Sequence, residues 1–184
     1  MTRYGFRVVG GCDGERRLTI WSTALAAHAA CDERAEVDRE AYLSAFTFCD
    51  DFREYLDTTG SPKGYVGPCG SDWLWFDLDA ADDRERALHD ARRLAAGLVE
   101  RFGLDGDDLL IFFSGSKGFH VGLPLSVCGS PGPSLIFPLV AKTLATGLAE
   151  LLGVTIDQGV YDRQRLFRAP NSRHPKTGLH KRRV

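Results

Sequence analysis

The sequence of 184 residues predicts a mixed α/β protein of the α+β type, built on a split βαβ sheet. Two observations carry this prediction. Short apolar runs, typical of buried strands, alternate with two long segments whose apolar residues recur at helical spacing. From Trp73 onward their order is β-α-β-β-α-β. Because that order is found in RRM-like and ferredoxin-like sheets, we expect such a core sheet with an N-terminal α/β elaboration beside it.

The N-terminal elaboration, residues 1–64, carries the weaker patterns. Residues 3–9 predict a strand that ends at two glycines. A helix is expected over residues 39–56, where Tyr42, Phe46 and Phe52 follow helical spacing. The cluster of Thr, Gly, Ser and Pro at residues 58–62 would end this helix.

The core, residues 65–184, carries clearer patterns and completes one compact domain. Residues 73–78 are aromatic and apolar, like a buried strand. Asp82 with Glu85 three residues later is a capping-box arrangement that would open a helix, and Gly103 would end it. The further expected elements are strands over residues 109–113 and 119–123, a helix over 135–152, and strands over 154–156 and 166–168.

Composition and absent motifs exclude several classes of protein. At 43% hydrophobic residues the chain can bury a core, and no stretch resembles a signal peptide or a membrane span. We therefore expect a cytoplasmic protein without membrane contact. The five cysteines are scattered without a C-x-x-C pair, so neither zinc nor a disulfide framework is expected. A P-loop and the hydrolase motifs G-x-S-x-G and H-E-x-x-H are also absent.

Charge is distributed unevenly along the chain. From Asp162 to Val184 there are eight Lys and Arg against one Asp, whereas the preceding residues carry 15 basic against 24 acidic side chains. A basic strip on an acidic body favours a local anion site, and a solvated basic tail is the alternative. The chain also ends abruptly in His-Lys-Arg-Arg-Val, so we expect it to be part of a longer protein.

Three aspartates follow apolar segments that are expected to be strands. Asp77 and Asp79 are two residues apart at the end of one strand, so both carboxylates should point to the same side. Asp157 ends the strand expected at 154–156, which a split βαβ sheet would place nearby. Neighbouring carboxylates repel unless a cation lies between them, and oxygen ligands favour Mg²⁺ or Mn²⁺. Strands also often end in Asp simply because Asp favours turns.

A turn between two apolar strands carries a second group of polar residues. Ser114, Ser116 and Lys117 lie in this glycine-containing turn, and His120 begins the next strand. Hydroxyls, an ammonium and backbone N–H groups together can hold a polyphosphate. An ordinary hairpin that uses Gly and Ser for conformational reasons is the alternative.

A third group of cationic residues follows in the basic strip. Arg165 and Arg168 flank the strand expected at 166–168, and their offset of three residues means that they need not face the same side. His174 and Lys176 follow in a rigid loop with two prolines. Several cations within a dozen residues suit recognition of phosphates, and a generic basic surface loop is the alternative.

Taken together, the three groups resemble the archaeo-eukaryotic primase superfamily, and above all its primase-polymerase branch. That family carries an acidic pair after an apolar strand, matched here by Asp77 and Asp79. Its second motif is a turn of small residues that runs to a histidine, matched by residues 114–120. Its third is an apolar-Asp block, followed by basic residues and a Pro-x-Ser-x-His-Pro-Lys-Thr-Gly-like loop, matched from residue 156 onward. The resemblance covers about residues 65–181.

The resemblance implies an enzyme, a DNA primase-polymerase that transfers nucleotides from NTPs or dNTPs to a primer 3′-hydroxyl or an initiating nucleotide. Asp77, Asp79 and Asp157 would be the catalytic residues and would hold two Mg²⁺ or Mn²⁺ ions. Single-stranded DNA template and primer would be partners, together with a C-terminal helicase or accessory domain. The residues implied in nucleotide binding are Ser114, Ser116, Lys117, His120, Arg165, Arg168, His174 and Lys176.

Three other functions compete with this interpretation. An end-joining repair polymerase of the same superfamily shares the acidic pair and the turn. A non-catalytic DNA-binding replication-initiator module should have lost at least one strand-end acid, and all three are present. A metal-dependent nuclease should lack the triphosphate-binding turn. The zinc-binding insertion of many cellular primases has no counterpart among the cysteines here.

The basic strip is expected to serve two purposes. Arg165 and Arg168 are close in sequence to Asp157 and should reach the phosphates of the nucleotide. Lys181, Arg182 and Arg183 lie beyond Gly178 and are expected to be solvated or to contact the backbone of a DNA strand.

Overall fold

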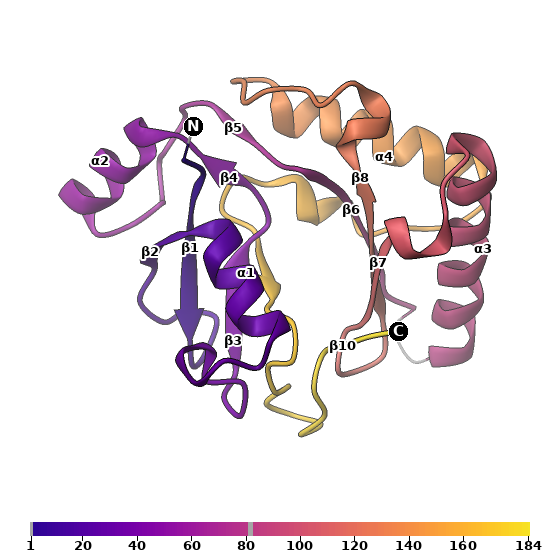
Figure 1. The fold of residues 1–184 in the computed structure, drawn as a ribbon, viewed down its shortest axis with the longest axis horizontal. Coiled ribbons are helices and arrows are strands. Elements are labelled where there is room, and N and C mark those ends of the chain that lie inside the picture. The colour runs from indigo at the N-terminus through magenta and orange to yellow at the C-terminus, as the bar shows by residue number, and fades with distance from the viewer. Residues whose placement is uncertain (1, 81–82) are drawn as a thin grey trace.

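The chain forms two antiparallel β-sheets that lie side by side, with helices packed around them (Figure 1). The computed structural model describes residues 2–80 and 83–184. Every pair of strands assigned in this part of the chain is antiparallel, and helices and strands alternate along it. The expected α+β class is therefore confirmed.

The four-stranded sheet contains the split βαβ unit. Its strand order is β10-β7-β8-β6. Helix α3 (Arg84–Phe102) connects β6 (Trp73–Leu78) to β7 (Leu110–Phe113), and β8 (Phe119–Pro124) lies between these two strands. The short strand β10 (Arg182–Arg183) extends the sheet at its β7 edge.

The last strand of the expected unit does not form, so the prediction of a strand at residues 154–156 is wrong. This segment runs irregularly after helix α4 (Phe137–Leu151). Asp157 ties it to β6 through a hydrogen bond from its backbone N–H to the carbonyl of Asp77, at 2.8 Å. Pairing goes no further because the chain turns at once into the 3₁₀ helix Gln158–Tyr161.

The second sheet combines strands from both ends of the chain. Its order is β5-β4-β1-β3-β9, and β2 pairs with β1. Strand β9 forms at the residues expected from the sequence, but it pairs with β3 here and does not join the core sheet. The strands of this sheet are β1 (Tyr4–Val9), β2 (Arg17–Ile20), β3 (Ala41–Ser44), β4 (Thr47–Phe48), β5 (Cys69–Gly70) and β9 (Leu166–Arg168).

The prediction of one helix over residues 39–56 is wrong for most of its length. Strands β3 and β4 occupy its first part, and helix α2 (Asp50–Thr59) begins only at Asp50. Seven of the eight residues from 41 to 48 are buried, and only Tyr42 is half-buried. A run that is buried on both faces has no period of its own, so the helical spacing of its aromatic residues is coincidental.

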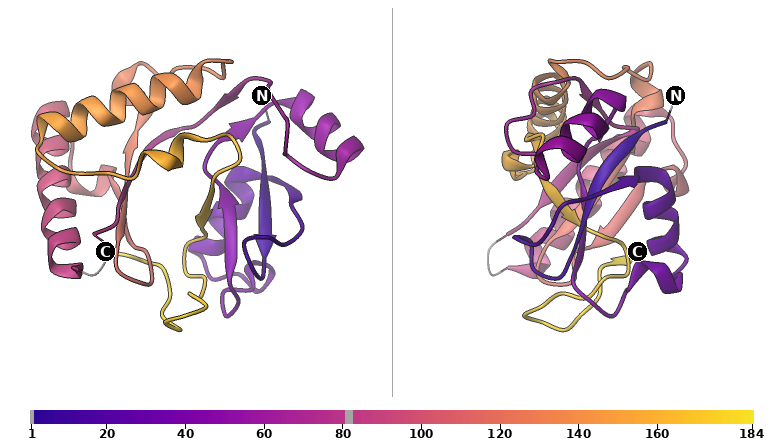
Figure 2. Two further views of the ribbon diagram at one scale, coloured as in Figure 1. Left: turned by 180° about the vertical axis from the view of Figure 1, so that it is seen from behind. Right: turned by 90° about the vertical axis from the view of Figure 1, so that its left-hand side faces the viewer.

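Helices α3 and α4 pack on the face of the four-stranded sheet that is turned away from the other sheet (Figures 1 and 2). Ala91, Leu94 and Leu98 form the buried stripe of α3, as expected from their spacing. The side chain of Asp83 accepts a hydrogen bond from the N–H of Arg86 and caps this helix, whereas Asp82 lies outside the described residues.

The C-terminal segment crosses from one sheet to the other. After β9 it leaves the six-stranded sheet, and at β10 it joins the edge of the four-stranded sheet (Figure 1). Helix α1 (Trp21–Ala29) lies beside its starting point, where the side-chain amide of Asn171 donates to the carbonyl of His28 at 2.9 Å. This segment therefore connects the two sheets.

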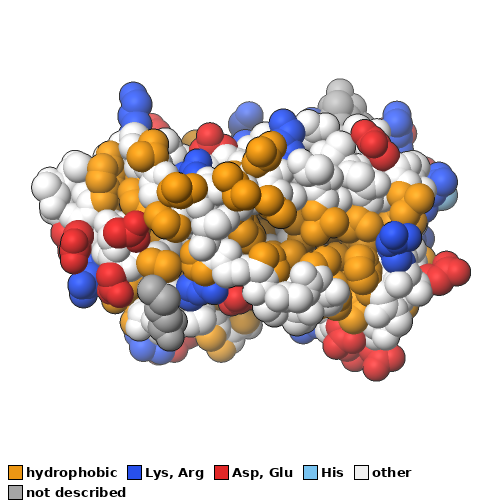
Figure 3. Space-filling view, turned by 90° about the horizontal axis from the view of Figure 1, so that it is seen from above, with side chains coloured by type: hydrophobic (Ala, Val, Ile, Leu, Met, Phe, Trp, Pro, Cys, Tyr) orange, Lys and Arg blue, Asp and Glu red, His pale blue; other side chains and the backbone are white. Residues whose placement is uncertain are grey.

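One face of the molecule is notably apolar (Figure 3). Leu135, Ile136 and Leu139, around the start of α4, are each more than 60% exposed. No helix of the described residues is long and apolar enough to cross a membrane.

Candidate active site

A cavity of about 730 Å³ is lined by nearly all the residues that the sequence predicted to form the site. Its walls come from β6, β8 and the turn before β8 in one sheet, and from β3 and β9 in the other. The loop after β9 forms a further wall. The predicted residues that line it are Asp77, Asp79, Ser114, Ser116, Lys117, His120, Arg165, Arg168, His174 and Lys176.

The acidic pair stands at the end of β6. Asp77 and Asp79 both line the cavity, and Leu78 between them is buried in the core. This arrangement is the one expected from alternation along a strand. The side chain of Asp77 is only 14% exposed, so its carboxylate has lost most of its hydration.

Loss of hydration makes Asp77 an unusual carboxyl group. Burial raises the pKa of Asp77 to about 6, the Arg165 guanidinium lowers it, and the charges of Asp157 and Asp79 raise it further. Ionisation of Asp77 at neutral pH therefore costs free energy, and a cation beside the carboxylate would offset that cost.

His120 faces Asp77 across the sheet. The two residues are register partners in β6 and β8, and His120 Nε2 lies 3.6 Å from Asp77 Oδ1. Burial lowers the pKa of His120 well below its usual value, and the charges of Lys181, Arg168 and Arg165 lower it further. The imidazole is therefore neutral, and the pair is not a salt bridge. Its Nδ1 is buried without a hydrogen-bond partner in the described structure.

Asp157 lies next to the acidic pair but does not line the cavity. Its Oδ1 accepts a hydrogen bond from the N–H of Gly159 at 2.8 Å, and its Oδ2 lies 3.0 Å from Arg165 Nη2. The same guanidinium nitrogen is 3.8 Å from Asp77 Oδ2. Arg165 therefore bridges two of the three predicted catalytic acids.

The turn before β8 is closed by its own first residue. The hydroxyl oxygen of Ser114 accepts hydrogen bonds from the N–H groups of Ser116 and Gly118, at 3.4 and 3.2 Å. The hydroxyl proton of Ser114 can still be donated to an anion. Ser116 and the half-buried Lys117 complete this wall of the cavity.

Arg168 is fixed from the six-stranded sheet. It pairs with Tyr42 across β9 and β3, and its guanidinium carbon lies 4.8 Å from the centroid of the Tyr42 ring. Its Nη2 donates to the Tyr42 hydroxyl and its Nη1 to the carbonyl of Arg173, both at 3.1 Å. Arg165 and Arg168 line the same cavity, although their spacing alone does not require it.

The loop that carries His174 and Lys176 rests on the turn before β8. The Thr177 hydroxyl donates to the carbonyl of Gly115 at 2.5 Å. His174 Nδ1 accepts hydrogen bonds from the N–H groups of Lys176 and Thr177, both at 3.2 Å. Burial lowers the pKa of His174, and the charge of Arg168 lowers it further. His174 therefore shapes the loop as a neutral acceptor.

Several lining residues were not identified from the sequence. Cys12, Glu40, Tyr42 and Thr177 all line the cavity. No sequence motif marks Cys12 or Glu40, and the spacing of Tyr42 from the following aromatic residues indicated a helix. The strand pairing that brings Tyr42 opposite Arg168 joins residues more than a hundred positions apart, so no local pattern could have revealed it.

The donor chemistry of this site fits a hard divalent cation. Within residues 2–80 and 83–184, no three His, Cys, Asp or Glu side chains lie close enough together to hold a metal ion. Asp77 and Asp79 nevertheless supply the carboxylate oxygens that Mg²⁺ and Mn²⁺ prefer. The Arg165 guanidinium lies between Asp77 and Asp157, so a cation shared by all three acids requires Arg165 to turn away.

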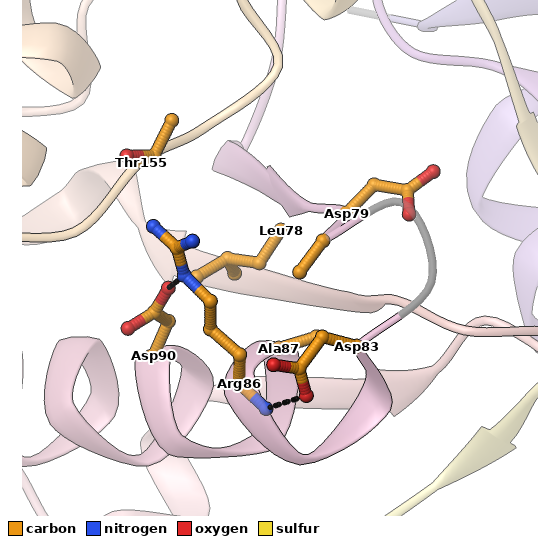
Figure 4. Close-up of a pocket in the computed structure, with 8 residues that line it drawn as sticks. Leu78, Asp79, Asp83, Arg86, Ala87, Asp90 and Thr155 are labelled. Atoms are coloured by element: carbon orange, nitrogen blue, oxygen red, sulfur yellow. Dashed lines mark hydrogen bonds and ion pairs between the residues drawn. The ribbon is translucent and has the colours of Figure 1, made fainter.

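A second cavity of about 730 Å³ lies on the other side of the acidic strand end (Figure 4). Helix α3 forms one wall with Asp83, Arg86 and Asp90, and Thr155 lies opposite. Asp79 lines both cavities, and its carboxylate points away from the Arg86–Asp90 ion pair in Figure 4. Arg86 is the one Lys or Arg among the described residues that line this second cavity, so phosphate binding is better served by the first.

Comparisons with known proteins agree with the resemblance seen in the sequence. No protein-family model matches the chain. The chain is 33% identical over 123 residues to the DNA primase small subunit PriS of Saccharolobus solfataricus, in an alignment that covers 54% of this chain and 36% of that protein. Among solved structures, the polymerase domain of ligase D from Mycobacterium tuberculosis, in complex with DNA, matches with a TM-score of 0.50. That likeness has 20% sequence identity and covers 96% of this chain and 62% of that chain.

The two likenesses differ in what they show. The structural match concerns the fold and extends over nearly the whole chain, including the N-terminal sheet. The sequence match is closer but spans about a third of the primase subunit. Together they confirm the resemblance of this chain to the archaeo-eukaryotic primase superfamily.

Proposed function

We propose that the chain is a template-directed nucleotidyltransferase, and specifically a DNA primase-polymerase. It would add nucleotides from NTPs or dNTPs to a primer 3′-hydroxyl or to an initiating nucleotide. The observation that carries this proposal is the cavity between the two sheets. It presents two carboxylates on one wall and a turn and loop with several cations on the others.

The cations of this cavity suit a triphosphate. Arg165 and Arg168 would each present a guanidinium to phosphate oxygens, which it can bind through two hydrogen bonds. Ser114 and the backbone of its turn would supply further donors. His120 is neutral and could donate one N–H without adding charge next to Asp77. These donors lie on structured elements, so they would be in place before the transition state develops charge.

The carboxylates would serve the other half of the reaction. Asp77 and Asp79 would hold a divalent cation, joined by Asp157 when Arg165 turns from the carboxylates to the triphosphate. Such ions, when bound, activate the attacking hydroxyl and neutralise charge on the leaving pyrophosphate. Arg165 would link the two events, because its guanidinium holds Asp77 and Asp157 only while no nucleotide is bound.

Single-stranded DNA is the proposed template, with a primer strand as partner. The support is indirect: the structurally similar ligase D domain was solved in complex with DNA, and the basic segment 162–184 borders the cavity. The chain spans about a third of the primase subunit that it matches. A helicase or accessory domain is a further proposed partner.

An end-joining repair polymerase is the second candidate, because the structural likeness is to a ligase D polymerase domain. The two candidates differ in the substrate that they extend. A primase-polymerase should act on a long single-stranded template, with or without a primer. An end-joining polymerase should prefer short gaps and overhangs at the ends of duplexes.

Incorporation of labelled dNTPs and NTPs on single-stranded, primed and gapped templates tests the proposal. With Mn²⁺ or Mg²⁺, the wild-type chain should incorporate nucleotides, whereas the double variant Asp77→Ala/Asp79→Ala should lose at least about 10³-fold of this activity. The matched control is Asp38→Ala/Asp57→Ala, which removes two carboxylates that do not line the cavity and should behave like the wild type. Equal activity of the two double variants would refute the assignment.

A further inference from the structure

The ammonium of Lys181 is buried, although the sequence suggested that it is solvated. Lys181 is only 3% exposed, whereas its neighbours Arg182 and Arg183 are exposed. Its Nζ donates one hydrogen bond, to the carbonyl of Arg168 at 2.9 Å. The prediction of a solvated side chain is therefore wrong for Lys181.

Three aromatic rings surround this ammonium. Its Nζ lies 4.7 Å from the ring centroid of Phe112, 5.7 Å from that of Phe167 and 5.9 Å from that of Trp75. Phe112 and Trp75 belong to the four-stranded sheet, and Phe167 belongs to β9 of the other sheet. Lys181 therefore sits in the seam between the two sheets, where cation–π attraction offsets part of its lost hydration.

Stability does not explain a charge at this position. Burying an ammonium costs free energy unless it is fully paired, and Lys181 makes one hydrogen bond to a neutral carbonyl. A methionine would fill the same space among the three rings without an ammonium to desolvate. Burial indeed lowers the pKa of Lys181 to about 7, which shows that the fold disfavours its charged form.

The charge instead lies near charged groups of the predicted site. Each neighbouring ionisable group belongs to the cavity: Asp77 on β6 raises the pKa of Lys181, Arg168 on β9 lowers it, and Lys181 in turn lowers the pKa of His120 on β8. A cation close to these lining residues favours an anionic ligand in the cavity.

The backbone of Lys181 also closes the loop that carries His174 and Lys176. Its N–H donates to the carbonyl of Ser172 at 3.0 Å, and its carbonyl accepts from the N–H of Asn171 at 2.8 Å. From this closed base the loop extends to Thr177, which rests on the turn before β8. The side chain of Lys181 thus contacts the Arg168 backbone, and the backbone of Lys181 fixes the loop.

We propose that Lys181 is a positioning residue of the nucleotide site: its buried ammonium holds the Arg168 carbonyl, and so sets the Arg168 guanidinium and the loop beside the triphosphate. This inference rests on the proposed function. It adds a residue that does not line the cavity itself and that acts through Arg168.

The test compares Lys181→Met and Lys181→Gln with the wild-type chain. Both variants should fold, and Lys181→Met, which leaves the Arg168 carbonyl without this donor, should lower the melting temperature only modestly. Lys181→Met should weaken nucleotide binding about 10-fold, because the hydrogen bond that positions the Arg168 backbone is removed. Lys181→Gln, whose amide can still donate to the Arg168 carbonyl, should lose less. Binding of single-stranded DNA should change little in either. Lys142→Met, at an exposed position of α4, is the matched control and should behave like the wild type.

Nucleotide affinity is best measured at equilibrium, with a fluorescent nucleotide and Mn²⁺, so that it does not depend on turnover. A wild-type chain that neither binds nor incorporates nucleotide overturns the proposed function, and this inference with it. A wild-type chain that does both, with Lys181→Met binding nucleotide equally well, overturns this inference alone. A variant that is destabilised but binds nucleotide normally would show that Lys181 is merely structural, and would also overturn it.

Discussion

At the scale of single residues, the proposed site depends on Asp77 being ionised where ionisation is unfavourable. Its side chain is mostly buried, and its pKa is raised to about 6 from an ordinary value of 3.8. A carboxyl whose pKa is raised in the folded state contributes stability below its unfolded pKa and loses that contribution as the pH rises through its folded pKa. Between pH 4 and pH 6 this charge should therefore destabilise the protein increasingly.

Asp77→Asn removes that cost. At pH 8, with EDTA present, the variant should have a free energy of unfolding higher by about 3 kcal/mol, and at pH 4 it should match the wild type. Denaturant titration at both pH values measures the difference. The exposed Asp57→Asn should change little at either pH. A variant that is destabilised at pH 8, or equally altered at both pH values, would show that Asp77 is not a strained carboxylate.

At the scale of elements, the short strand β10 separates two uses of positive charge. Lys181 precedes it and is buried, whereas Arg182 and Arg183 are exposed at the outer edge of the four-stranded sheet. Arg182 Nη1 donates to Asn171 Oδ1 at 2.9 Å, and Arg183 Nη2 donates to the carbonyl of Asp107 at 3.3 Å. Neither arginine lines the cavity. We therefore expect their charge to be available to a strand of DNA and not to the nucleotide.

Arg182→Gln/Arg183→Gln should weaken binding of single-stranded DNA. The slope of log affinity against log salt should become shallower by about 0.7 for each DNA phosphate that the variant no longer neutralises. Nucleotide affinity should stay unchanged, because both side chains are outside the cavity. Titrations of DNA and of nucleotide at several salt concentrations measure both effects. Equal reductions of the two affinities would mean that the basic segment is one continuous phosphate track.

Sequence patterns predicted the elements around the acidic pair well, because local signals determine them. The strands at 73–78 and 119–123, the helix ended by Gly103 and the helix over 135–152 all form near the expected bounds. Helix α1 and strand β2 were missed. Residues 41–48 were misassigned because β3 and β4 pair with strands that are distant in the sequence. The burial of Lys181 likewise depends on rings from three strands that no local pattern connects.

At the scale of the whole molecule, the site belongs to neither sheet alone. The four-stranded sheet supplies the acids, His120 and the turn, whereas the six-stranded sheet supplies Arg168 with its partner Tyr42. The C-terminal segment joins the two sheets and adds the loop with His174. Because β9 lies within the N-terminal sheet, residues 1–64 are structurally bound to the core through strand pairing. The boundary expected at residue 64 is still a prediction.

The central claim is that a triphosphate binds in the cavity between the two sheets. A crystal structure of the chain with a non-hydrolysable nucleotide and Mn²⁺ tests it most directly. We predict phosphates against the turn of residues 114–118, Arg165 turned from Asp157 toward them, and Mn²⁺ on Asp77 and Asp79. Phosphates bound outside this cavity, or a nucleotide bound with Arg165 still bridging Asp77 and Asp157, would contradict it.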